Sequence, residues 1–130
     1  MSEGKKNELA VITMTKELAK YVMTVTQKSP KHFRFSLVAK LQSLSIEAVE
    51  YMYRANDFYV SKDRRDEYEK RLSCQRQAMT ALRLLTFMAE IAEETGCIFF
   101  KQYENICRQA ESCENKLGAW ITGDRRRMGL

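Results

Sequence analysis

The chain has 130 residues, of which 45% are hydrophobic and 30% charged, and its 22 lysines and arginines outnumber its 17 acidic residues to give a formal net charge of +5. This length suits one domain whose core can stand without disulfides or metals, and one proline with five glycines is too few for the turns of an all-β protein. The composition therefore predicts a single all-α domain over residues 1–130.

The first predicted helix spans residues 7–27 and ends before the only proline of the chain. Its apolar residues recur at helical spacing, namely Val11, Ile12, Leu18, Ala19, Val22, Met23 and Val25. Ser29-Pro30 ends this helix, because proline cannot donate an interior hydrogen bond and pushes the residue before it out of the α region. The stretch SPKHFRFS, residues 29–36, is therefore predicted to be a corner between two helices.

Ser36 is a candidate N-cap for a second, amphipathic helix, because a serine hydroxyl can accept a hydrogen bond from an N–H group of the first turn. The apolar stripe of this helix recurs at steps of three or four residues, through Leu37, Leu41, Leu44, Ala48, Tyr51 or Met52, Ala55 and Tyr59. The stripe predicts a helix that reaches the next corner, near Ser61.

Ser61 is the corresponding N-cap candidate for a third helix, whose first turn holds acids that complement the helix dipole, Asp63, Asp66 and Glu67. Within ALRLLTFMAEIA, residues 81–92, the polar residues lie along one narrow line, Arg83, Thr86 and Glu90. Most of this helix is therefore expected to be buried. Thr95-Gly96 provides its C-terminal stop, because glycine tolerates the left-handed conformation.

The fourth helix carries the most regular apolar repeat of the chain, with the alternating steps of four and three residues that are typical of a bundle seam. Its positions are Phe99, Tyr103, Ile106, Ala110, Cys113, Leu117 and Trp120. Burial of a large apolar side chain contributes about 1.5–3 kcal/mol, so this seam is expected to supply much of the drive for docking the helix. Gly118 falls beside the seam, where the missing side chain would let a neighbouring backbone approach.

The connections predicted at residues 29–35, around residue 61 and at residues 95–98 are short. Short connections make sequential helices pack antiparallel, which predicts an up-down-up-down four-helix bundle. The apolar face of the third helix is broader than three partners in a slim bundle can cover. We therefore expect an outer part of it to meet another subunit in a homo-oligomer.

The residues that could support catalysis or hold a metal are few. His32 is the only histidine and has no carboxylate beside it in the sequence, so we interpret it as a donor within a basic patch and not as a catalytic base. One histidine cannot supply the two Glu-x-x-His turns of a di-iron bundle, and the glycines are too scattered for a phosphate-binding loop. A zinc site of His32 with three cysteines is conceivable, but Cys113 lies on the predicted seam and Cys107 beside it. We expect no enzyme activity, cofactor or metal.

Cysteine usage and hydropathy indicate a cytoplasmic protein. The cysteines at positions 74, 97, 107 and 113 form no C-x-x-C pair, and the start MSEGKKNELA has no apolar segment of a secretory signal. No apolar run approaches the roughly 18 residues of a membrane span. We therefore expect reduced thiols and no membrane association.

Positive charge is concentrated in two parts of the sequence that an antiparallel bundle places at opposite ends. One is the first corner, where residues 28–40 contain four cations and no acid. The other joins the start of the third helix to a basic C-terminal tail, residues 123–130. Arginine forks suit phosphate and carboxylate groups, so both zones are candidates for nucleic-acid or partner binding. The candidate residues are Lys28, Lys31, His32, Arg34, Lys40, Arg64, Arg65, Arg71, Arg76, Arg125, Arg126 and Arg127.

Two stretches of the chain resemble one family of small four-helix-bundle proteins. They are SPKHFRFSLVAKLQSLSIEAVEYMYRAN, residues 29–56, and LGAWITGDRRR, residues 117–127. The family includes the accessory variability determinant of diversity-generating retroelements and proteins encoded in intervening sequences of bacterial 23S rRNA genes. The intervening-sequence branch has Pro-Lys-Glu at the corner where this chain has Pro30-Lys31-His32, which favours the retroelement branch.

The resemblance implies a basic bundle that assembles as a ring-like homopentamer, binds a reverse transcriptase and nucleic acid, and supports the mutagenic copying of template RNA into cDNA. It implies no catalysis by the bundle itself, because the partner performs the polymerisation. Residues that match the first-corner motif are Pro30, Lys31 and Arg34, and those that match the last-helix motif, as packing residues, are Leu117, Gly118, Trp120 and Ile121.

Two alternatives remain open at the level of sequence. The bundle could be a structural or protein-interaction component of a mobile element or rRNA intervening sequence, without affinity for nucleic acid. A metal-dependent or cysteine-based hydrolase would instead require a cavity where His32 meets a cysteine, and replacement of His32 by alanine would then abolish an activity.

Overall fold

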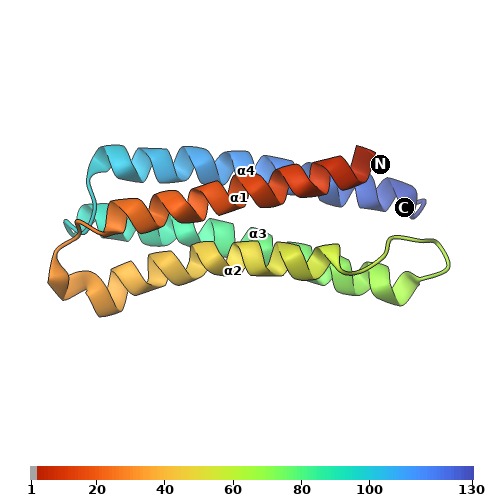
Figure 1. Cartoon of the computed structure of the whole chain (residues 1–130), viewed down its shortest axis with the longest axis horizontal. Coiled ribbons are helices and arrows are strands. Elements are labelled where there is room, and N and C mark those ends of the chain that lie inside the picture. Colours follow the sequence, from red (N-terminus) through yellow and green to blue (C-terminus); the bar gives the residue numbers. More distant parts are fainter. Residues whose placement is uncertain (1–2) are drawn as a thin grey trace.

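The structure, a computed structural model, describes residues 3–130, with side chains from residue 10 onward. This part of the chain contains four α-helices and no strand (Figure 1): α1 (Glu3–Thr26), α2 (Ala39–Asn56), α3 (Arg65–Glu94) and α4 (Phe100–Arg127). Helices that follow one another along the chain run in opposite directions, and α1 packs against both α2 and α4, which closes the bundle. The prediction of an all-α, up-down-up-down four-helix bundle is confirmed.

The core is formed by the helical stripes that the apolar spacing predicts. On α4 the seam is fully or almost fully buried from Ile106 through Ala110, Cys113 and Leu117 to Trp120. The prediction is wrong at Phe99, which is 74% exposed. This residue lies just before α4, where its backbone N–H donates a 2.9 Å hydrogen bond to Oε1 of Gln102, so its ring lies outside the helical repeat.

The corner at Pro30 breaks the chain as predicted, but the next helical segment begins earlier than Ser36. α1 ends at Thr26, and a 3₁₀ turn (Lys31–Phe33) and a π-helical turn (Arg34–Val38) then lead directly into α2. Ser36 therefore lies inside the π-helical turn, where its hydroxyl donates a 3.4 Å hydrogen bond to the Phe33 carbonyl. The expected N-cap at Ser36 is wrong, because helical hydrogen bonding resumes right after the proline.

The second corner also differs in detail. α3 begins at Arg65, so Ser61 is too early to cap it, and its hydroxyl instead donates to the carboxylate of Asp63. This hydroxyl lowers the pKa of Asp63 below its ordinary value. Asp66 and Glu67 do occupy the first turn of α3, as predicted.

The third corner follows the prediction at Gly96, which has φ +86°. The Cys97 N–H donates a 2.7 Å hydrogen bond back to the Ala92 carbonyl, which closes the end of α3. The expectation that most of residues 81–92 are buried is only partly correct. Ala81, Leu82, Leu85, Ala89 and Ala92 are buried, whereas Leu84 is 43% and Phe87 56% exposed.

The end of α4 holds two further differences from the sequence expectation. Residues 125–127 form the last turn of α4 and not a separate tail, and the helix closes through a hydrogen bond of 2.9 Å from the Leu130 N–H to the Arg125 carbonyl. Gly118 does not admit a neighbouring backbone, because a Cβ placed there would meet nothing within 4 Å. The expected close approach at Gly118 is therefore wrong.

Candidate functional site

The structure places the predicted basic residues at the two ends of the bundle. We define the corner zone as the exposed basic side chains between α1 and the first turns of α2, which are Lys28, Lys31, His32, Arg34 and Lys40. Within the described residues none of them takes part in an ion pair. Their positive charge is therefore directed entirely to the solvent.

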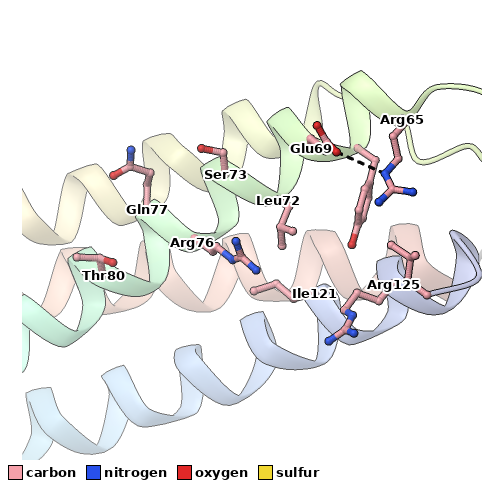
Figure 2. A pocket seen from close by; sticks show the side chains of 11 residues that line it. Arg65, Glu69, Leu72, Ser73, Arg76, Gln77, Thr80, Ile121 and Arg125 are labelled. Carbon is pink, nitrogen blue, oxygen red and sulfur yellow. Dashed lines mark ion pairs between the residues drawn. The ribbon is translucent and has the colours of Figure 1, made fainter.

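The second set gathers around a groove lined by residues of α3 and α4. These residues come from the first half of α3 and the end of α4, which lie at the end of the bundle opposite to the corner zone (Figure 1). We call this groove the α3–α4 groove; it has a volume of about 700 Å³. Arg65 and Arg76 line it from α3 and Arg125 from α4, and Figure 2 shows Arg76 extending from α3 toward α4. Leu72 and Ile121 supply an apolar floor between these cations. The groove thus combines guanidinium groups with a partly apolar base.

Ion pairs reduce the charge of some of these arginines. Arg64 pairs with Glu67 at 3.0 Å, and Arg65 pairs with Glu69 at 3.5 Å in the pair drawn in Figure 2. Arg127, in the last turn of α4, pairs with Asp124 at 2.6 Å. Within the described residues, no ion pair engages the remaining exposed arginines of this end, which are Arg76, Arg125 and Arg126. These three are the guanidinium groups available to an anion.

Arg71 is the clear exception to the predicted surface zone, because its side chain is buried with only 3% of the residue exposed. Its Nε and Nη2 donate hydrogen bonds of 2.7 and 3.0 Å to the two carboxylate oxygens of Asp124, which is 1% exposed. The prediction that Arg71 contacts nucleic acid or a partner is therefore wrong. A charge at this depth is paired internally, since leaving it unpaired would be very unfavourable.

Around this pair the groove has a rigid support. Arg71 also donates a 3.0 Å hydrogen bond to the Phe58 carbonyl, and its guanidinium carbon lies 5.0 Å from the centre of the Trp120 ring. Gln75 Nε2 donates to Asp124 at 2.9 Å. The network ties α3, α4 and the α2–α3 connection together, so the exposed arginines project from a fixed surface.

A second groove between α3 and α4 is lined by acidic side chains, one of which, Glu114, pairs with Arg83 at 3.7 Å. This groove, of about 450 Å³, is lined by Glu90 from α3 and by Glu111 and Glu114 from α4, with Tyr103 and Cys107 beside them. Burial raises the pKa of the Cys107 thiol, which keeps it protonated near neutral pH. The side chains here therefore offer carboxylates and a protonated thiol, but no activated nucleophile.

The described residues do not bring histidine, cysteine and acidic side chains together as a metal site. No group of three or more histidine, cysteine or acidic side chains there is placed to hold a metal ion. Cys97 and Cys113 are buried, as the interpretation of the cysteines as core residues predicts, and His32 is exposed at the corner. None of the helices in the described range has both the length and the apolar character needed to cross a bilayer.

The apolar floor of the α3–α4 groove and the buried Arg71–Asp124 pair that supports it were not predicted from the sequence. The spacing of residues along α4 contains a signal for the buried pair. One further step of four residues continues the α4 seam from Trp120 to Asp124. Comparison with known proteins adds no assignment: no protein-family model and no curated protein matches this chain. The geometry alone supports an anion-binding surface with two separate basic ends.

Proposed function

We propose that this protein is a non-catalytic, nucleic-acid-binding accessory protein, and that the α3–α4 groove contacts the phosphate backbone of its ligand. The observation that carries the proposal is the convergence of Arg76 from α3 and Arg125 from α4 on one groove, neither of them in an ion pair with any residue whose side chain the structure describes. Arginine forks bind phosphate oxygens in a bidentate way. Such contacts supply affinity without sequence preference.

The resemblance of residues 29–56 and 117–127 to retroelement accessory proteins supplies the biological setting of this proposal. In that setting the ligand is template RNA or cDNA, and the partner is the reverse transcriptase that copies it mutagenically. The packing role that the resemblance implies fits Leu117 and Trp120, both of which are buried. A reverse-transcriptase gene flanked by paired template and variable repeats next to the coding gene would support the assignment, and a neighbourhood without one would contradict it.

A homo-oligomer, a pentamer by the resemblance, is part of the proposal. Support comes from Leu84 and Phe87, which lie one helical turn apart on α3 with 43% and 56% of their surface exposed. Apolar side chains this exposed and this close together are typical of surfaces that another protein covers. They also favour the second candidate function, a protein-interaction bundle without nucleic-acid affinity.

The salt dependence of binding separates the two functions. Fluorescence anisotropy of a labelled duplex and a labelled single strand is measured over a series of salt concentrations for the wild type and for Arg76→Ala/Arg125→Ala. Each lost phosphate contact should reduce the slope of log K against log salt by about 0.9 on duplex and about 0.7 on single strands. The double variant should therefore bind both ligands more weakly, and its slope should be reduced by the amount expected for the loss of about two phosphate contacts.

The matched control removes the same number of charges elsewhere. Lys16→Ala/Lys116→Ala lowers the net charge equally, from exposed positions on α1 and α4 that do not line the groove. This control should bind like the wild type except for a small uniform weakening. Equal losses in the two double variants would refute a groove-specific site, and absence of any wild-type binding would favour the protein-interaction function.

A further inference from the structure

Phe35 is the most exposed large apolar side chain in the described part of the molecule, with 91% of its surface accessible. It lies on the π-helical turn (Arg34–Val38) at the corner between α1 and α2. Single exposed apolar residues are common on protein surfaces, so its surroundings must decide whether it has a role. Short π-helical turns occur frequently at functional sites.

The surroundings of Phe35 are uniformly cationic along the chain. No acidic residue occurs between Glu17 and Glu47. Lys31 and Arg34 are both exposed and precede Phe35 by four residues and one residue in the sequence. Acids at this end of the bundle come from the end of α3, Glu93 and Glu94, and from the start of α4, where Glu104 pairs with Lys101. None of them forms an ion pair with the corner zone in the described residues. The ring thus stands among unneutralised cations.

The backbone that presents Phe35 is held in place by its other aromatic neighbours. Phe33 is half-buried and packs against the core, and the His32 ring lies with its centre 4.1 Å from that of Phe33. Ser29, at the start of the corner, donates a 2.7 Å hydrogen bond to the Cys97 carbonyl of the α3–α4 connection. The ring is therefore directed outward from a corner that is anchored on both sides.

We propose that the Phe35 ring stacks on an unpaired base while Lys31 and Arg34 contact the flanking phosphates, so that the corner zone binds single-stranded nucleic acid. The inference rests on the proposed function and adds a ligand class to it. Every base presents a flat face to an aromatic ring, and a positively charged surface with stacking rings is the usual design of single-strand binding. Paired bases are stacked inside a duplex and cannot reach Phe35, so the corner should discriminate strand state.

An anionic membrane surface would also attract these cations, but the observations favour the base. Stable membrane anchoring requires two signals, and even one long acyl chain alone gives only marginal, reversible binding. A single phenylalanine ring inserts far less apolar surface than an acyl chain. Base stacking, in contrast, uses one ring for each base.

The test compares Phe35→Ala with the wild type for binding to an oligo(dT) of about 16 nucleotides and to a duplex of the same length. Loss of one stacking contact should weaken single-strand binding by about 5- to 150-fold and leave duplex binding unchanged. Phe35→Trp should bind the single strand as tightly as the wild type does. The new tryptophan adds fluorescence to that of buried Trp120, and the oligonucleotide should quench this added fluorescence. Because Phe35 is exposed, these variants should fold like the wild type.

Ile46→Ala is the matched control, since Ile46 is likewise an exposed apolar residue but lies on α2, beside Glu47 and outside the corner zone. Wild-type affinity of Phe35→Ala for the single strand, or an equal loss on the duplex, would overturn the inference. A loss restricted to binding of phosphatidylserine vesicles would assign the corner to a membrane surface and would also overturn it. If Arg76→Ala/Arg125→Ala loses nucleic-acid affinity and Phe35→Ala does not, the inference fails while the proposed function stands. If Phe35→Ala loses single-strand affinity and the groove variant keeps it, only the role of the α3–α4 groove is refuted.

Discussion

Replacement of Asp124 by asparagine should destabilise the fold strongly, although the shape of the side chain is kept. The carboxylate of Asp124 accepts hydrogen bonds of 2.7 and 3.0 Å from Arg71, and the two residues are only 1% and 3% exposed. Removing one partner of a buried ion pair leaves the other charge without compensation, which costs about 3–5 kcal/mol. Asp124 lies near the C-terminus of α4, where the helix dipole disfavours a negative charge, but that effect is only about 0.3–1 kcal/mol. The loss of the pair therefore dominates.

Urea unfolding followed by circular dichroism measures this change. Glu69→Gln is the control, because the Arg65–Glu69 pair on the same bundle is exposed and should contribute at most about 1 kcal/mol. The double variant Arg71→Met/Asp124→Leu should recover most of the stability, since it leaves no buried charge unpaired. An Asp124→Asn variant that unfolds at the same urea concentration as Glu69→Gln would refute the reasoning.

Three further perturbations follow from particular residues. Gly118→Ala should raise the free energy of unfolding by about 0.5–1 kcal/mol in the same assay, because the new methyl group meets nothing within 4 Å; Gly96→Ala should lower it, because φ is +86°. Burial raises the pKa of the Cys113 thiol, so mass spectrometry after mild alkylation near neutral pH should find it unmodified until urea is added; rapid native modification would contradict its placement. Leu84→Ser/Phe87→Ser should lower the mass found by sedimentation if α3 forms a subunit interface, and an unchanged mass would exclude that face.

The bundle itself could be predicted because its determinants are local and repetitive. A stripe with steps of three and four residues requires only helical geometry and the burial of apolar surface. Pro30 and Gly96 act through their own backbone restrictions, so their positions fix two corners without knowledge of the tertiary structure. The N-caps were less predictable, since the hydroxyls of Ser36 and Ser61 donate hydrogen bonds to nearby residues, Phe33 and Asp63, and do not cap a helix.

The site was predictable only as far as charge and helix direction determine it. Arg76 and Arg125 belong to the expected basic end, but their meeting across one groove depends on how α3 and α4 pack. Arg71 was predicted to lie on the surface because arginine is usually exposed. Its spacing of seven residues from buried Ala78 and the step from Trp120 to Asp124 put opposite charges on two core faces, a pairing that appears only once the helices are docked.

The π-helical turn at the first corner is a place where the chain length can change by one residue. Such a turn holds one residue more than an α-helical turn, so deletion of a single codon within Arg34–Val38 would convert it to regular α-helix. Because the i→i+5 turn takes up its extra residue within a single turn, this deletion would leave the direction of the corner relative to the rest of α2 nearly unchanged. The buried stripe from Leu41 onward would keep its register. The chain can therefore lose one residue at this point without repacking the interior.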